Sequence, residues 1–353
     1  SKSMLTEECA MNPFLERHGI DVVETDLGER ILQLLHQKPS HIVMPAIHLK
    51  REEVGRMFEE KGISTEKGND DPTYLTQCAR KHLRNQFMEA GAGMTGCNFG
   101  VAKTGDIVVC TNEGNADMTT SMPKLHLVAM GIEKIVPDYK SLAVFQRLLC
   151  RSATGQPTTA YTSHFRQARP GAEMHVILVD NGRSDILAND EHWETLKCIR
   201  CGACMNTCPV YRRSGGYSYT YFIPGPIGIN LGMLHDASRY NDNVSACTLC
   251  LSCDNVCPAK VNPGSQVYMW RQKLDSLHKA NTMKKCMSKG MEELFDHPQL
   301  YSSALRLAPL ANLIPEGLTH IRTLNPWGVA HAMPNFAKES FQTMWKKGKL
   351  KKQ

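Results

Sequence analysis

Eight cysteines stand in two runs of identical spacing, and thiolates in this pattern are typical ligands of iron–sulfur clusters. The chain of 353 residues holds 14 cysteines, and the six outside the runs lie singly, as small buried side chains do. Disulfide frameworks are typical of short secreted chains, whereas the first residues here lack the layout of a secretory signal. The runs share the spacing Cys-x2-Cys-x2-Cys-x3-Cys-Pro and comprise Cys198, Cys201, Cys204 and Cys208, then Cys247, Cys250, Cys253 and Cys257.

A cubane 4Fe-4S cluster needs one thiolate on each of four irons, and two-residue spacers let three cysteines of one loop supply three of them. The fourth cysteine follows a longer spacer and precedes a proline, and in two-cluster proteins it ligates the other cluster. We therefore predict two 4Fe-4S clusters. The first takes Cys198, Cys201, Cys204 and Cys257, and the second takes Cys247, Cys250, Cys253 and Cys208.

Zinc is the alternative metal, because Cys-x2-Cys pairs also build tetrahedral zinc sites. Zinc has no use for a third cysteine at the same step or for the Cys-Pro ending, so the spacing favours iron. A zinc-bearing chain would be an adaptor for nucleic acid or protein, and a colourless protein containing zinc would support it. The net charge of +6 is modest for this length, and we predict no nucleic-acid partner.

The residues before the cysteine runs alternate between helical and strand patterns, which predicts an α/β domain with a mostly parallel sheet over residues 1–187. No apolar run approaches the length of a membrane span, so the chain is not predicted to be transmembrane. Helical spacing occurs at 28–37, 50–61, 72–88 and 141–150, and strand patterns occur at 41–44, 106–110, 125–129, 132–136, 158–164 and 175–180.

The composition changes after residue 187, where short helical pieces begin to alternate with the cysteine runs. We predict a helical two-cluster domain at 188–274 and a helical C-terminal extension at 275–353, which ends in a helix at 334–347. The stretch 210–246 between the runs is too long for a tight hairpin and has helical spacing. It resembles the α-helical ferredoxin domain of succinate dehydrogenase and heterodisulfide reductase subunits.

Polar residues directly follow the predicted strand at 106–110 and form a candidate ligand crevice. They are Asn112, Glu113 and Asn115, and polar groups at the carboxyl end of a parallel strand often line a binding site, although a plain turn explains them equally well. The glycine-rich stretch 91–96 matches a dinucleotide-binding pattern, yet it follows a helix and leads into no helix. We expect it simply to end the preceding helix.

Several segments together resemble the lactate-utilisation iron–sulfur protein B family. They are TDLGERILQL, PSHIVMPAIH, TGDIVVCTNEGNADM, PKLHLVAMGIEKIVP and LKCIRCGACMNTCPVYR. The resemblance implies an N-terminal LUD domain of the sugar-isomerase and CoA-transferase type, incomplete at its N-terminus here because family members usually begin earlier. It places the cluster ligands on the eight cysteines and the family's NEGN motif on residues 112–115.

The same resemblance implies a cytoplasmic system that oxidises L-lactate to pyruvate, with a cysteine-rich subunit and a second LUD-domain subunit as partners. Lactate oxidation removes two electrons, whereas 4Fe-4S clusters carry one at a time and no flavin or nicotinamide site is recognisable. Our hypothesis is therefore an electron relay. The rival hypothesis makes the α/β domain an enzyme that binds a small molecule or CoA ester, with structural or regulatory clusters.

Overall fold

The computed structural model describes residues 3–276, 282–321, 331 and 335–349. Contacts divide the chain into two compact units, Ser1–Lys279 and Ala280–Gln353. The first unit contains the predicted α/β region and both cysteine runs, so the contacts that matter for the site lie within it. None of the helices in the described ranges combines the length and the apolar character that crossing a membrane requires.

Two sheets form the centre of the α/β region. One has the order β1-β4-β7 with parallel pairing throughout, and the other has the order β5-β2-β3-β6 with both parallel and antiparallel pairs. The α/β class predicted from the sequence is confirmed. The strands are β1 (Ala92–Thr95), β2 (Phe99–Val101), β3 (Asp106–Thr111), β4 (Leu125–Gly131), β5 (Ile135–Val136), β6 (Tyr161–Phe165) and β7 (Glu173–Val179).

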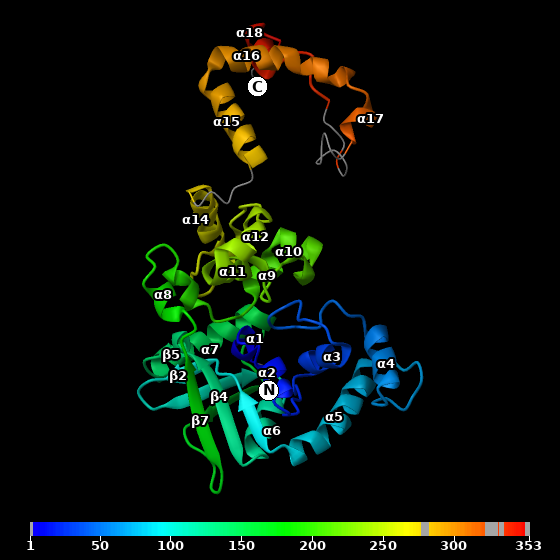
Figure 1. Ribbon diagram of the computed structural model, residues 1–353, viewed down its shortest axis with the longest axis vertical. Coiled ribbons are helices and arrows are strands. Elements are labelled where there is room, and N and C mark those ends of the chain that lie inside the picture. Colours follow the sequence, from blue (N-terminus) through cyan, green and yellow to red (C-terminus); the bar gives the residue numbers. More distant parts are fainter. Residues whose placement is uncertain (1–2, 277–281, 322–330, 332–334, 350–353) are drawn as a thin grey trace. The chain divides into compact units, whose positions relative to one another are not determined.

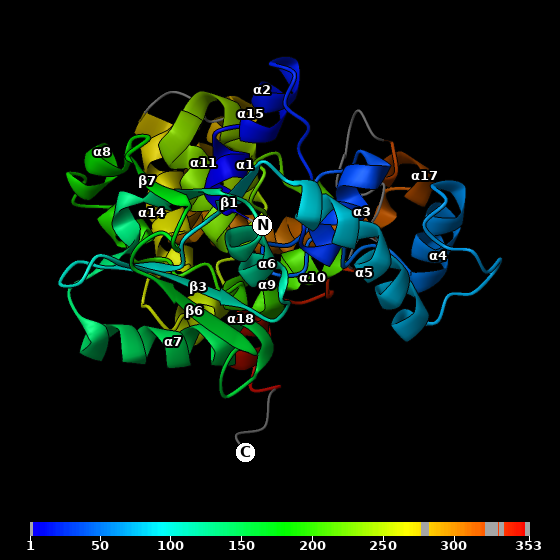
Figure 2. The same ribbon diagram turned by 90° about the horizontal axis from the view of Figure 1, so that it is seen from below.

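Helices accompany these sheets, and several begin at an aspartate that caps the first turn. Asp71 accepts a hydrogen bond from the backbone of Tyr74 and Asp138 from that of Ser141, both at 2.9 Å, which satisfies amides that have no partner inside the helix. Figure 2 shows α7 running along the mixed sheet, and α7 contacts β2 and β5. The helices are α1 (Met4–Glu8), α2 (Met11–Arg17), α3 (Leu27–Leu35), α4 (Arg51–Glu60), α5 (Pro72–Glu89), α6 (Asn115–Ser121), α7 (Tyr139–Thr154) and α8 (Arg183–Leu187).

The strand predicted at 41–44 is wrong, because the segment folds into a turn. His41 Nδ1 accepts hydrogen bonds from the backbone amides of Val43 at 3.0 Å and Met44 at 3.1 Å. The amide of Ser40 is also used locally, on the carbonyl of Pro45. Amides bound in this way cannot join the ladder of a neighbouring strand. The buried Ile42 of this turn packs instead into the core of the cysteine-bearing helices.

The glycine-rich stretch 91–96 does end α5, but it also forms the strand β1, which the sequence analysis did not predict. Glycine is needed at position 93 for a steric reason. A Cβ atom at this position would lie 1.9 Å from the carbonyl oxygen of Thr119 in α6. The glycine therefore lets α6 approach the strand, which is a packing role and not a nucleotide-binding one.

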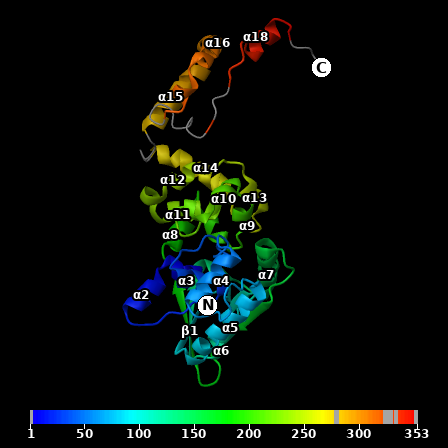
Figure 3. The same ribbon diagram turned by 90° about the vertical axis from the view of Figure 1, so that its right-hand side faces the viewer.

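The cysteine-bearing part of the first unit is a group of short helices around one apolar core, and Figure 3 shows α9 to α14 gathered beside the α/β region. Val244, Val267 and Met205 are fully buried in this core. The helix predicted between the two runs is α11, which changes direction at Asp236, whose backbone is not helical. The helices are α9 (Ala203–Thr207), α10 (Pro209–Ser214), α11 (Gly225–Tyr240), α12 (Asp242–Ser245), α13 (Ser252–Val256) and α14 (Pro263–Ser276), preceded by the 3-10 turn η2 (Trp193–Lys197).

The second unit is helical in its described residues, as predicted (Figure 1). Its last helix is shorter than the predicted 334–347, because Ser340 caps it by accepting a hydrogen bond from the amide of Thr343. Pro334, where the prediction began, lies outside the described residues. The elements are α15 (Thr282–Asp296), α16 (Pro298–Leu307), η4 (Ala308–Leu313), α17 (Glu316–Thr319) and α18 (Phe341–Lys346). The domain boundaries at 187/188 and 274/275 stay predictions.

Candidate cluster-binding loops and the adjoining cavity

The two cysteine loops repeat the same backbone conformation as well as the same spacing. Arg200 and Gly202 flank the middle cysteine of the first loop with φ of 62° and 78°, and Leu249 and Leu251 flank that of the second with 55° and 56°. Residues other than glycine rarely adopt this left-handed region, because Cβ crowds the following carbonyl. Its occurrence at equivalent positions shows that the two loops share one backbone conformation.

The four thiols predicted to hold the first cluster surround one small cavity. Its other walls are apolar or backbone, from Ile42, Ile227 and the Gly202–Ala203 turn. Burial first, and the nearby thiols of Cys198 and Cys257 in addition, raise the pKa of Cys201 to about 11. The structure thus brings Cys257, from the second run, beside cysteines of the first. The four cysteines lining this cavity are Cys198, Cys201, Cys204 and Cys257.

The thiols predicted to hold the second cluster are also grouped across the two runs. Burial first, then Asp254 and the thiols of Cys247 and Cys208, raise the pKa of Cys253 to about 12. Cys250 is exposed, and the backbone amide of Ser252 lowers its pKa. Cys208, from the first run, therefore lies with the second group, whose outer member Cys250 faces solvent.

Backbone amides point at sulfur in both groups, as they do around iron–sulfur clusters. The amide of Leu249 donates to Cys247 Sγ, and that of Val261 donates to Cys257 Sγ, each at 3.3 Å. Four thiols about an apolar cavity, with amides aimed at sulfur, fit the donor set that a cubane cluster requires. In the ranges described, no three His, Cys, Asp or Glu side chains are close enough to hold a single metal ion.

Charged side chains fix the loop of the second run. The Arg271 guanidinium donates to the carbonyl of Val244 at 3.0 and 3.1 Å and also to that of Cys247. Asp254 accepts hydrogen bonds from the backbone amides of Gly264 at 2.5 Å and Ser265 at 3.0 Å. These contacts tie the loop to α14 and hold its thiols in place, and Asp254 also accepts a hydrogen bond from the Cys253 thiol at 3.6 Å.

The three crevice residues Asn112, Glu113 and Asn115 line a larger cavity of about 360 Å³ between the α/β region and the first cysteine loop. All three side chains also accept hydrogen bonds within the fold, two of them from backbone amides. Asn112 accepts from the amide of Ala160 at 3.0 Å, Glu113 accepts from the amide of Leu27 at 3.2 Å, and Asn115 accepts from the Thr111 hydroxyl. The three residues therefore line the cavity and also hold neighbouring parts of the fold.

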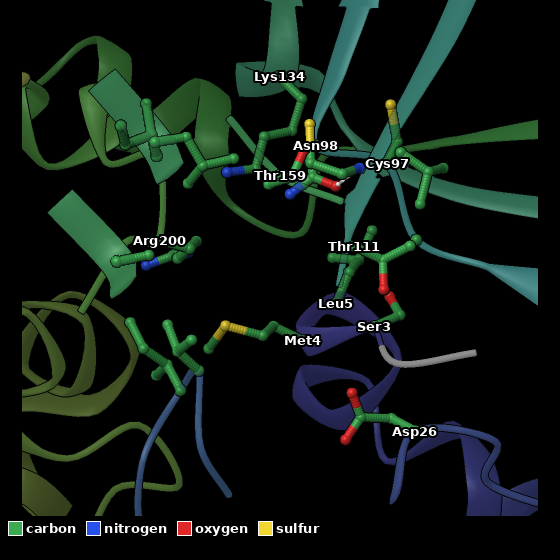
Figure 4. Close-up of a pocket in the computed structure, with 18 of the residues that line it drawn as sticks. Ser3, Met4, Leu5, Asp26, Cys97, Asn98, Thr111, Lys134, Thr159 and Arg200 are labelled. Atoms are coloured by element: carbon green, nitrogen blue, oxygen red, sulfur yellow. Dashed lines mark hydrogen bonds between the residues drawn. The ribbon is translucent and has the colours of Figure 1, made fainter. Parts of the chain in front are cut away.

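Two cations at this cavity were not singled out in the sequence analysis. Lys134 lies in the turn between β4 and β5 and donates from Nζ to the carbonyl of Cys198 at 3.2 Å. Arg200 lies inside the first cysteine run and also lines the cavity. The available signal was the presence of charged residues between apolar ones, Glu133 and Lys134 in GIEKIV and Arg200 in CIRC. Figure 4 shows both side chains beside the open space, opposite Thr111 and the α1 residues.

Comparison with known proteins agrees with this two-part organisation. The LUD domain family matches residues 2–186, and the 4Fe-4S dicluster domain family matches residues 194–261. Lactate utilization protein B of Bacillus cytotoxicus is 40% identical over 99% of this chain and 76% of that protein. The uncharacterized electron transport protein YkgF of Escherichia coli is 39% identical over 98% of this chain and 75% of that protein. No solved structure matches.

The α/β region and the paired cysteine loops define a protein with an N-terminal LUD domain followed by a 4Fe-4S dicluster domain. Within that class, the chain belongs to the lactate utilization protein B family, as the resemblance indicated. It spans about three quarters of the length of these relatives.

Proposed function

We propose that this chain is the iron–sulfur electron-transfer subunit of a cytoplasmic complex that oxidises L-lactate to pyruvate. The eight cysteines hold two 4Fe-4S clusters, with Cys257 ligating the first and Cys208 the second. The partners are a cysteine-rich subunit and a second LUD-domain subunit. A bound cluster of this kind takes up and releases one electron at a time.

The observation that carries the proposal is that the fourth cysteine of each run lies beside thiols of the other run. Cys257 lines the same cavity as the three cysteines of the first run, and the Cys208 thiol lies close enough to Cys253 and Cys247 to affect their pKa values. Ligands exchanged in this way bring two clusters close together, which suits transfer between them. The printed names of the relatives, which include lactate utilization and electron transport, agree with this role.

The burial of the two groups suggests the direction of transfer. Cys201 is 8% exposed and packs into the core beside Ile199, next to the large cavity. In the second group, Cys250 is exposed and is followed by Leu251, whose side chain is 42% exposed. We propose that electrons enter at the first group, from the side of the cavity, and leave through the second group at the surface.

The relay is tested by rapid anaerobic mixing of the iron-replete chain with its two partner subunits and lactate. We expect the visible absorbance of the oxidised clusters to bleach at least as fast as pyruvate forms, because every electron pair must pass through them. Addition of the terminal acceptor should restore the absorbance within one turnover. Pyruvate that accumulates over many turnovers while the clusters do not change would show that they lie outside the electron path.

The rival function, an α/β enzyme acting on a small molecule or CoA ester, is favoured by the position of Glu113 on the cavity wall. Glu113→Gln separates the two, because the glutamine amide oxygen can still accept from the amide of Leu27 while the charge is lost. The relay predicts little change in the lactate-driven rate. A catalytic carboxylate predicts a loss of about 100-fold or more, with dithionite reduction of the clusters unaffected.

A further inference from the structure

The second unit carries all of the net positive charge of the chain. Residues 280–353 hold 11 Lys and Arg and 5 Asp and Glu, whereas the whole chain holds 41 and 35. The net charge of +6 therefore falls in this unit, and residues 1–279 are neutral in total. Five lysines fall within residues 346–352, and the structure describes three of them, at the end of α18 and just after it. Blocks of like charge are typical of segments that bind an oppositely charged partner.

Acidic residues of the same unit do not cancel this charge. Residues 317–353 contain seven Lys and Arg, and Glu339 is the only acidic residue among them. Glu339 binds both Lys347 and Lys349, at 2.8 Å each, so one carboxylate is shared by two ammonium groups. The helix α15 has three lysines and three acidic residues and is neutral by itself. The excess of positive charge is thus concentrated around α18.

Aromatic side chains from three helices gather beside these lysines. Phe341 and Trp345 of α18 stack with 6.1 Å between their ring centres and are 66% and 52% exposed. Both line one hollow of the surface together with Tyr301 of α16 and Lys346. Phe295 of α15 packs edge-on against Tyr301, with 5.7 Å between the ring centres. We call Phe295, Tyr301, Phe341 and Trp345 the aromatic patch.

The aromatic patch is not the core of this unit. In the described residues, α16, η4 and α18 have no buried side chain at all. Large apolar side chains are exposed along the same elements, among them Leu300, Leu307 and Leu313. Contiguous apolar surface of this kind marks a site of interaction with a partner or a membrane.

The composition of the surface favours an anionic lipid membrane over a protein partner. Protein interfaces are depleted in lysine and use arginine for positive charge, whereas nine of the eleven cations in this unit are lysines. Lysines near a bilayer are attracted to anionic headgroups. Trp and Tyr are enriched at the level of the headgroups, because their rings combine an apolar body with a polar edge. Charge attraction and apolar burial then act together, as in helices that lie in the membrane interface.

We propose that the aromatic patch and the lysines of residues 346–352 bind the surface of an anionic phospholipid membrane. Phe341 and Trp345 enter the boundary between headgroups and acyl chains, and Lys346 and its neighbours meet the lipid phosphates. Binding of this kind needs no helix that crosses the bilayer. It goes beyond the electron relay and does not depend on it, because the lysines and the aromatic patch belong to the second unit and not to the cysteine loops.

The test is co-sedimentation of the anaerobically purified, iron-replete full chain with lipid vesicles. Vesicles of phosphatidylcholine and phosphatidylglycerol are compared with vesicles of phosphatidylcholine alone. We expect binding to the anionic vesicles to be at least about 10-fold tighter and to weaken as salt is added. The variants Phe341→Ser/Trp345→Ser and Lys346→Gln/Lys347→Gln should each weaken it by about 10- to 100-fold.

Matched changes in the first unit should leave vesicle binding unaltered. Val144→Ser/Leu187→Ser removes two exposed apolar side chains, and Arg212→Gln/Arg213→Gln removes two exposed cations. Fluorescence gives an independent signal. The tryptophan emission should shift to shorter wavelength when anionic vesicles are added, and Trp345→Phe should abolish this shift.

Several results would overturn the assignment. They are the absence of binding to anionic vesicles, equal binding to both kinds of vesicle, or unchanged binding in Phe341→Ser/Trp345→Ser. A dimer, or a complex with a partner subunit, that this variant dissolves while vesicles do not bind would assign the aromatic patch to a protein. Iron is counted for every variant, and if one loses iron, the vesicle comparison with the unchanged chain decides the question. Lactate-driven cluster reduction is measured without vesicles, so the relay and the membrane proposal fail separately.

Discussion

The double variant Cys198→Ser/Cys257→Ser should lose one cluster and keep the other, with about four irons per chain. Both residues line the cavity of the first group, so in the crossed arrangement both changes damage the same cluster. The companion variant Cys198→Ser/Cys208→Ser should lose both clusters, because Cys208 belongs to the second group. Iron and sulfide analysis and the EPR spectrum of the reduced protein measure the result.

An uncrossed arrangement predicts the reverse pattern. Cys198→Ser/Cys257→Ser would then empty both clusters, and Cys198→Ser/Cys208→Ser would spare one. Cys286→Ser is the matched control, since Cys286 is an exposed cysteine outside the runs. We expect its iron content to equal that of the unchanged protein. The pair of double variants therefore tests the ligand exchange directly, which a single serine variant cannot do.

Arg183→Met should destabilise the first unit by about 3–5 kcal/mol, because it leaves two buried carboxylates without their cation. The guanidinium is 6% exposed and binds Glu8 of α1 and Glu133 of the turn after β4. These contacts join the N-terminal helix to the ends of β4 and β7. Denaturant unfolding followed by circular dichroism measures the loss, and Arg147→Met, at an exposed position of α7, should stay within about 0.5 kcal/mol of the unchanged protein.

The destabilisation caused by Arg183→Met should depend on pH in a definite direction. Burial raises the pKa of Glu8, but the hydrogen bonds from Arg183 and Asn181 outweigh burial and hold it below the ordinary value of 4.5. In the unchanged protein, Glu8 thus contributes stability above about pH 4.5 and loses it as the pH falls further. Without Arg183, burial raises the pKa of Glu8. Acidification then protonates the carboxylate and removes the free-energy cost of burying its charge. The stability difference should narrow from pH 7.5 to pH 5, and a constant difference would contradict this assignment.

Much of the local structure follows from short stretches of sequence. The spacing of Asp71, Pro72 and the apolar residues after them predicted α5, because capping and helical periodicity act within a few turns. The turn at 41–44 could not be predicted in the same way. Its apolar run reads as a strand, and only the hydrogen bonds to His41 and the packing of Ile42 against a distant core decide otherwise.

The sequence by itself determined the class of chemistry, since two-residue spacers place three thiols on one loop whatever surrounds it. It also determined the α/β class and the helical character of the cysteine-bearing part. Only the tertiary structure decided which thiols surround one cavity. It also decided that Lys134 and Arg200 both line the larger cavity next to it. The physical reason is that spacing within a loop is set by covalent geometry, whereas residues far apart in the chain are brought together by the packing of whole cores.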